Sequence, residues 1–116
     1  MDTIHPPQRS TAELWQDYYF LTNEMEKLIL KQNVDLFLEL MEQRQRLQPI
    51  IEKEPDNGFR VSPEGRALLK KIQNTEQAIN MKLQFMRNKA GQQQKVSAAY
   101  DGLNGSIVGN FINSIR

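Results

Sequence analysis

The first apolar pattern in the chain begins after Ser10 and has the period of a helix. Ser10 can cap a helix, and Glu13, three residues later, completes a capping-box pattern. Apolar side chains then recur at alternating steps of four and three residues: Leu14, Tyr18, Leu21, Met25 and Leu28. This spacing places them on one face of an amphipathic helix, which is predicted over residues 11–31. Residues 1–9 contain two prolines and no period, and they are expected to form a mobile arm.

A second helix is predicted over residues 34–54, with Asn33 as its N-cap and Asp35 in its first turn, where the helix dipole favours a negative charge. Its first turns are apolar on more than one side, which indicates contacts with two neighbouring elements. Pro49 cannot donate a hydrogen bond to the carbonyl of Gln45. Because the apolar pattern continues beyond Pro49, we expect a kink there rather than the end of the helix.

The clearest turn in the chain is "PDNG" at residues 55–58, in which every residue is a turn former. After it, Ser62 can cap a third helix, and Pro63 can take the first helical position, which needs no backbone N–H. The apolar stripe then continues in phase as far as Tyr100, which predicts one long helix over residues 63–100. Gly91 is the point at which this helix would break, since glycine costs about 1 kcal/mol relative to alanine.

The predicted helices differ in length. The first two, of roughly 21 residues, would each be roughly 31 Å long, and the third would be roughly 57 Å long. The third helix would therefore extend past its partners, and its apolar stripe would need a cover: the tail of residues 101–116, a second copy of the chain, or another protein. The predicted fold class is all-α. Residues 1–116 would form a single domain, an antiparallel helical hairpin or three-helix bundle whose C-terminal segment folds back or docks.

Charge adds an asymmetry to this picture. The 116 residues carry a net charge of +1, yet residues 1–59 hold six Lys or Arg and eleven Asp or Glu, whereas residues 60–116 hold nine and three. Either an acidic front half packs beside a basic back half, or the basic half meets an acidic partner. No apolar run approaches the ~20 residues of a membrane span, and "MDTIHPPQRS" has no signal-peptide core. A cytoplasmic protein without a membrane span is expected.

Candidate chemistry is sparse. Cysteine is absent and His5 is the single histidine, so no zinc site is expected. The C-terminal glycines do not follow the spacing of a phosphate loop, and the carboxylates of the first two helices look like solvated surface rather than an acid–base pair. We interpret the chain as a non-enzyme that needs no cofactor. The lysines and arginines between residues 66 and 95 do not form one unbroken helical face, so nucleic-acid binding is not expected.

The order of these segments resembles the FliT-type flagellar export chaperones, which are related to the FlgN type. The resemblance runs through most of the chain: a first helix, the link "KQNVD", a helix ending "QRLQPIIEK", a long helix that starts with proline, and a terminal segment. The sharpest stretch, "QQQKVSAAYDG", is similar to the lysine, small-residue and tyrosine pattern after the long helix of that family. The closing "GNFINSIR" resembles a Gly-x-Phe-Ile ending, although Asn113 stands where such relatives often carry a charge.

The resemblance implies binding rather than catalysis. FliT-like proteins hold the filament-cap protein before secretion, engage the export ATPase, and in some bacteria restrain a flagellar transcription activator. Their C-terminal segment can fold over the partner-binding face. On this basis a client helix would dock in a groove by its amphipathic face. The expected partner-binding residues are the stripe of the third helix and three residues carried over from the family pattern: Ile72, Ile79, Leu83, Met86, Tyr100, Phe111 and Ile112.

Alternatives remain at this level. The same stripe would serve as plain core packing in a structural coiled-coil subunit that forms a homodimer or heterodimer. Such a subunit would be an obligate oligomer, whereas a chaperone would bind a client helix. A small nucleic-acid-binding regulator is a third interpretation, and its binding would weaken steeply with salt.

Overall fold

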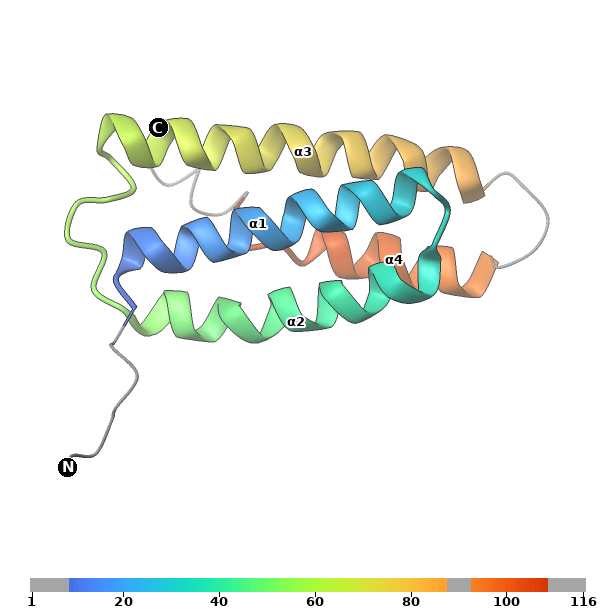
Figure 1. Ribbon diagram of the computed structural model, residues 1–116, viewed down its shortest axis with the longest axis horizontal. Helices are drawn as coiled ribbons and strands as arrows, with labels where there is room; N and C mark the ends of the chain where they lie inside the picture. The colour runs from blue at the N-terminus through green and yellow to red at the C-terminus, as the bar shows by residue number, and fades with distance from the viewer. Residues whose placement is uncertain (1–8, 88–92, 109–116) are drawn as a thin grey trace, which may run out of the picture.

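A computed structural model of the chain describes residues 9–87 and 93–108, and 82% of the described residues are helical. The described part contains four helices and no strand, which confirms the predicted all-α class (Figure 1). The helices are α1 (Thr11–Leu30), α2 (Val34–Lys53), α3 (Pro63–Arg87) and α4 (Gln93–Asn104). None of these helices combines the length and the apolar character that a membrane crossing requires.

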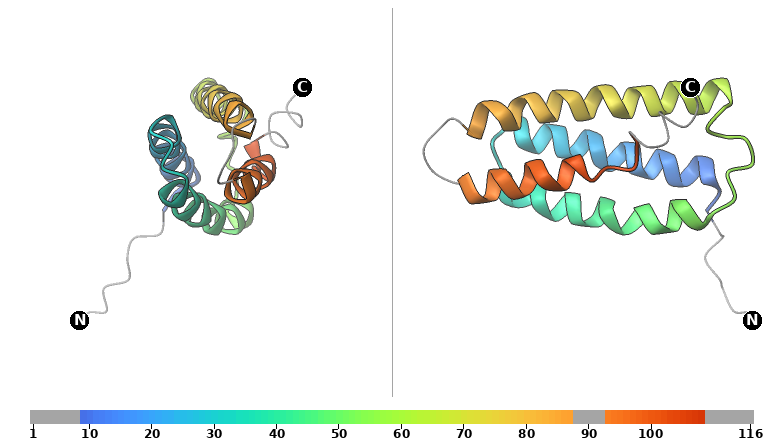
Figure 2. Two further views of the ribbon diagram at one scale, coloured as in Figure 1. Left: turned by 90° about the vertical axis from the view of Figure 1, so that its right-hand side faces the viewer. Right: turned by 180° about the vertical axis from the view of Figure 1, so that it is seen from behind.

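The four helices form two antiparallel hairpins that lie side by side. α1 packs against α2 and α3, and α4 also packs against α2 and α3. Neighbours along the chain run in opposite directions, so α1 is parallel to α3 and α2 is parallel to α4 (Figure 2). The connection from α2 to α3 therefore crosses the end of the bundle diagonally.

The helix starts follow the local sequence signals. The capping box of α1 is formed: the Glu13 backbone N–H donates to Ser10 Oγ at 3.2 Å, and the Ser10 backbone N–H donates to Glu13 Oε1 at 3.0 Å. Asn33 Oδ1 accepts a hydrogen bond from the backbone of α2, and Ser62 Oγ accepts one from the backbone of α3. These caps satisfy backbone donors that have no partner within the helix.

The N-terminal half of the structure bears on two sequence predictions, the end of the second helix and the mobile arm. α2 continues through Pro49 to Lys53, so this proline does not end the helix. Arg9, assigned to the mobile arm, belongs to the described residues, and its Nη2 lies 2.6 Å from Asp17 Oδ1. The remainder of the predicted arm, residues 1–8, lies outside the described residues.

The predicted long helix of residues 63–100 is wrong in the structure. α3 ends at Arg87, and α4 returns along α2 and α3 instead of extending beyond them. Gly91, the expected break, lies outside the described residues. The physical reason is burial: a continuous helix would leave its far apolar stripe in water, whereas the returning helix buries Val96, Ala99 and Leu103.

The apolar core divides into two clusters along the bundle axis. Cluster A lies toward the end with the α1–α2 turn, and its buried members are Met25, Ile29, Val34, Phe37, Met41, Ile79, Leu83, Met86, Val96, Ala99 and Leu103. Cluster B lies toward the other end, and its buried members are Leu14, Trp15, Tyr18, Ile51, Leu68, Leu69, Ile72, Ile107 and Val108. All four helices contribute to cluster A, whereas α4 has ended before cluster B.

A layer of polar side chains separates the two clusters. Each of α1, α2 and α3 contributes one polar side chain to a hydrogen-bonded group between cluster A and cluster B, and the chain after α4 contributes a fourth polar residue. We call Thr22, Arg44, Glu76 and Ser106 the polar layer.

Candidate functional site

The four α3 residues predicted to bind a partner lie in the core of the bundle. Ile72 is a member of cluster B, and Ile79, Leu83 and Met86 are members of cluster A. Ile72, Ile79 and Leu83 have no exposed surface at all. In the closed bundle these side chains are therefore not available to another protein. Phe111 and Ile112, the predicted anchors of the tail, lie outside the described residues.

The C-terminal part of the chain covers these residues. α4 contributes Val96, Ala99 and Leu103 to cluster A, and the segment after it contributes Ile107 and Val108 to cluster B. We call residues 93–108 the C-terminal cover. A covering tail was expected to begin at residue 101. The structure places the start of the cover earlier, because α4 itself is part of it.

Tyr100, the remaining predicted residue, lies at the rim between α3 and α4. Its ring is half-buried against cluster A, and its hydroxyl oxygen accepts a hydrogen bond from Gln84 Nε2 at 3.5 Å. The Arg87 guanidinium lies over the ring, 4.9 Å from the centroid. A cation over an aromatic face is attracted by the ring quadrupole, so Tyr100 connects α4 to the last turn of α3.

Close approach between α4 and α2 depends on a glycine. A Cβ atom at Gly102 would overlap the end of the Met41 side chain, which would have to move. An ion pair also joins the two helices, with Lys95 Nζ 2.8 Å from Asp35 Oδ1. Both partners are at least half exposed, and exposed pairs of this kind add little stability. Apolar contact therefore provides most of the attachment of α4.

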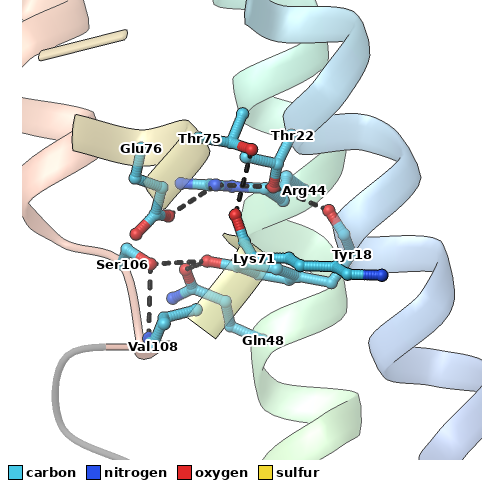
Figure 3. A network of polar contacts seen from close by, with 9 residues as sticks. All are labelled: Tyr18, Thr22, Arg44, Gln48, Lys71, Thr75, Glu76, Ser106 and Val108. Atoms are coloured by element: carbon cyan, nitrogen blue, oxygen red, sulfur yellow. Dashed lines mark hydrogen bonds and ion pairs between the residues drawn. The ribbon is translucent and has the colours of Figure 1, made fainter. Parts of the chain in front are cut away.

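Arg44 organises the polar layer. Its side chain is completely buried, and Nη1 donates to Glu76 Oε2 at 2.7 Å and to Thr22 Oγ1 at 2.9 Å (Figure 3). The guanidinium also lies over the ring of Tyr18, 4.5 Å from its centroid. The contact with Glu76 bridges the diagonal between α2 and α3, whose backbones do not touch. A single cation thus connects α1, α2 and α3 in the interior.

Tyr18 bridges the other diagonal. Its hydroxyl donates to Gln48 Oε1 at 3.1 Å and lies 2.9 Å from Ser106 Oγ. A phenol has one proton, so the Ser106 hydroxyl is the donor in the second contact. Ser106 Oγ in turn accepts a hydrogen bond from the Val108 backbone N–H at 3.3 Å. This chain of contacts attaches the C-terminal cover to α1 and α2.

Burial dominates the electrostatics of the layer. It raises the pKa of the Tyr18 phenol to about 12, although the Arg44 guanidinium offsets part of the shift. Burial also raises the pKa of the Glu76 carboxyl, again with partial compensation from the Arg44 guanidinium. The Glu76 carboxylate is the counter-ion of the Arg44 guanidinium.

A pocket of about 230 Å³ leads to the polar layer from the side between α3 and the end of α4. Its lining is mostly polar: Gln73, Glu76, Gln77, Asn80, Leu103, Asn104 and Ser106. Among the described residues, Asn80 Oδ1 and Arg44 Nε are buried without a hydrogen-bond partner. Buried polar atoms of this kind are costly, and one of them, on Asn80, belongs to the lining of this pocket.

Several of these residues escaped the sequence analysis. Arg44 lies in phase with the buried residues of α2, which are Val34, Phe37, Met41 and Ile51, so a charge on an apolar stripe was the available signal. On α3 the helical period between Ile72 and Ile79 predicts Thr75 on the apolar stripe, but Glu76 is the residue that contacts the interior. Ser106 carried no signal, because its role depends on the turn that follows α4.

Comparisons with protein-family models, with curated proteins and with solved structures give no match to the chain. Within the described residues, no group of three or more His, Cys, Asp or Glu side chains could hold a metal ion. The function is therefore inferred from the packing of the C-terminal cover on α2 and α3.

Proposed function

We propose that the protein is a cytoplasmic binding protein of the export-chaperone type, in which the C-terminal cover is displaced by a helical segment of a client. The observation that carries the proposal is that the apolar stripe of α3 is buried under α4, a short helix, and not within a bundle of long, continuous helices. The resemblance to FliT-type chaperones supplies the client class, a filament-cap-like protein of the flagellum, and a second contact with the export ATPase.

The attachment of α4 supports a cover that opens. α4 has 12 residues, including Gly102. Helices of fewer than roughly 12 to 15 residues are marginal in water, so α4 depends on docking for its structure. Glycine within it lowers the helix propensity further. The C-terminal cover is therefore the part of the bundle that we expect to open at the lowest free energy.

The surface beneath α4 fits an amphipathic helix. If α4 leaves, Ile79, Leu83 and Met86 on α3 face Phe37 and Met41 on α2 across the vacated position. Two of these five side chains are methionines, which adapt to partners of different shape. A client helix with apolar residues at the spacing of Val96, Ala99 and Leu103 would fill the same groove.

The polar layer gives the cover a defined closed position. The hydroxyl pair of Tyr18 and Ser106 is made only when the segment after α4 lies on the bundle. Hydrogen bonds of this kind add about 1 kcal/mol, which favours closure without making it permanent. A client that binds the groove then shifts the population from closed to open.

The test uses the full chain and a labelled peptide that copies residues 93–108, "QQKVSAAYDGLNGSIV". Leu103→Ala weakens the intramolecular cover, since deletion of a buried leucine side chain costs about 2–5 kcal/mol. Ser97→Ala is the matched control on the exposed side of α4. We expect the Leu103→Ala protein to bind the peptide about tenfold more tightly than the wild type, because its groove is free more often.

Fluorescence anisotropy reports binding, and the emission of Trp15, which lies in cluster B, reports that the rest of the bundle is folded. Equal affinity in the wild-type and Leu103→Ala proteins would contradict a displaceable cover. An obligate oligomer by concentration-dependent mass measurement would favour the structural-subunit alternative instead.

A further inference from the structure

We infer that the outer face of α3 is a second binding surface, separate from the groove under the C-terminal cover, and that it takes an acidic amphipathic helix of another protein. We define this outer face by residues that project away from the core: Arg66, Lys70, Lys71, Met81, Lys82 and Phe85.

The apolar part of this face is exposed to solvent. Met81 is 71% exposed and Phe85 is 54% exposed, and they are one helical turn apart. Lys82 Nζ lies over the Phe85 ring, 5.3 Å from its centroid, so its alkyl stem borders the same patch. Large apolar side chains are costly to leave in water, and a methionine next to a phenylalanine is a common composition of binding surfaces.

The charged part of the face has no acidic counterpart. α3 has two carboxylates: Glu64 lies in its first turn, and Glu76 faces Arg44 in the interior. Within the described residues, Arg66, Lys70, Lys71 and Lys82 form no ion pair. By contrast, Lys27 on α1 pairs with Glu24, and Arg46 on α2 pairs with Glu42.

Two of these cations also lie close to each other on the surface of α3. Arg66 and Lys70 are four residues apart, so two like charges are neighbours on the helix surface. Such a pair destabilises an isolated helix, and stability of the bundle gives no reason for it. A partner that brings carboxylates to this position would remove the repulsion.

The distribution of charge on the outer face of α3 also distinguishes between the partners that could bind it. A second copy that docked α3 against α3 by twofold symmetry would place the same cations opposite one another, so self-pairing through this face is disfavoured. An amphipathic helix on an anionic membrane has an apolar stripe along its centre with cations on both sides. Here the apolar residues occupy one end of α3 and most of the cations occupy the other.

That lengthwise separation matches a single partner helix. The face from Arg66 to Phe85 is about 28 Å long, or five helical turns. A helix with apolar residues at one end and Asp or Glu at the other would cover Met81 and Phe85 while its carboxylates meet Arg66, Lys70 and Lys71. The apolar contact supplies affinity and the charges supply orientation and rate of association.

The experiment titrates the full-length protein with a labelled helical peptide that has leucines in one half and glutamates in the other. A second peptide with lysine in place of glutamate is the charge control. Two double variants remove the surface: Lys70→Glu with Lys71→Glu, and Met81→Ser with Phe85→Ser. Two matched controls change exposed residues elsewhere: Lys53→Glu on α2 and Phe20→Ser on α1, where Phe20 is 62% exposed.

We expect each α3 double variant to weaken binding of the acidic peptide by about tenfold or more, and we expect both controls to leave it unchanged. Added salt should weaken wild-type binding and have a smaller effect on the Lys70→Glu, Lys71→Glu protein. The inference is overturned if the basic peptide binds equally well or if the α3 variants bind like the wild type. It is also overturned if the acidic peptide does not bind while a DNA duplex or phosphatidylserine vesicles bind through the same residues.

Discussion

At the scale of single residues, Arg44 holds the most demanding position in the molecule, because a permanent charge is placed completely out of contact with water. The buried ion pair with Glu76 offsets the loss of hydration, and Thr22 and the Tyr18 ring add further favourable contacts. A buried pair of this type contributes little net stability compared with an apolar pair. The main effect of the ion pair is to make any other packing of the helices unfavourable if it separates the two partners.

Replacement of Arg44 by methionine should therefore be severe. The variant leaves the Glu76 carboxylate buried without a counter-ion, and we expect the free energy of unfolding to fall by about 3–5 kcal/mol. The control is Arg46→Met, since Arg46 and its partner Glu42 are both exposed. That change should stay within about 0.5 kcal/mol of the wild type in the same urea titration.

The double variant Arg44→Met, Glu76→Leu tests the cause of that loss. If the unpaired carboxylate is responsible, the second substitution should restore much of the stability. A double variant as unstable as the single one would mean that the packing of Arg44, rather than its charge, matters.

Tyr18 makes the molecule sensitive to alkaline pH. Its pKa in the folded protein is raised from 10.0 to about 12 by burial, so the folded state holds this proton more tightly than the unfolded state. The corresponding stabilisation is complete below pH 10 and is lost as the pH rises from 10 to 12. It amounts to about 2–3 kcal/mol.

Tyr18→Phe should remove this alkaline loss. At neutral pH the same variant should be about 1 kcal/mol less stable than the wild type, because the hydrogen bonds to Gln48 and Ser106 are gone. Urea titrations at pH 7, 10 and 12 provide the measurement, and Tyr19→Phe is the control. An unchanged pH profile in Tyr18→Phe would show that this phenol is not the group involved.

At the scale of elements, Pro49 offers a clear test. Both Pro49 and Gln45 are exposed, so the missing hydrogen bond lies on the outer side of α2. Pro49→Ala restores the donor to the Gln45 carbonyl and should raise the free energy of unfolding by about 1–3 kcal/mol. The thermal midpoint of unfolding, compared with that of the Ile50→Ala control, measures the effect. A lower midpoint would mean that a bend at Pro49 is required to place Ile51 in cluster B.

The start of each of the first three helices was predictable from sequence because it depends on neighbours along the chain. Ser10 with Glu13, Asn33, and Ser62 with Pro63 act on backbone groups within three residues of themselves. The same local character explains the turn at "PDNG", in which Asn57 and Gly58 adopt left-handed φ angles. Local signals of this kind need no knowledge of the tertiary structure.

The side of each helix that points into the core was predictable only in part, because it depends on contacts between helices. On α1 the sequence favoured Leu21 and Leu28, whereas Thr22 and Ile29 are the fully buried residues. The predicted and the observed buried faces of α1 differ by a rotation about the helix axis that is smaller than the angle between successive residues. The positions of α2 and α3 determine which of the two faces is buried. The polar layer is harder still, since its members come from four segments that sequence analysis treats separately.

The reversal between α3 and α4 was missed for a thermodynamic reason. Local propensity allowed a helix to continue past residue 87, but a continuous helix could not have buried Val96, Ala99 and Leu103 against α2 and α3. Burial of three apolar side chains outweighs the propensity of a few linking residues.

At the scale of the whole molecule, truncation after Tyr100 should open the bundle. It removes Leu103, Ile107 and Val108, which together close both clusters on the C-terminal side. Each buried side chain of this type contributes about 1.5–3 kcal/mol to stability, so the remainder of α4 should dissociate from α2 and α3. We expect tighter binding of a client helix and more self-association, measured by anisotropy and by sedimentation velocity.

A second truncation, after Val108, is the matched control. It keeps every described contact of the C-terminal cover and removes Phe111 and Ile112. If it reproduces the full effect, the anchors of the cover lie in the last eight residues. If the truncation after Tyr100 binds a client more weakly than the intact chain, the cover is itself part of the binding surface.

The diagonal link between α2 and α3 has a consequence for stoichiometry. Two chains that trade their α3–α4 hairpins would rebuild every contact of the bundle between them, with the link as the only segment that changes shape. Within this link, Asn57 and Gly58 adopt left-handed φ angles of 55° and 80°. A β-branched residue at position 58 disfavours that geometry and would straighten the link. We therefore expect these two φ angles to favour the closed monomer over a dimer with exchanged hairpins.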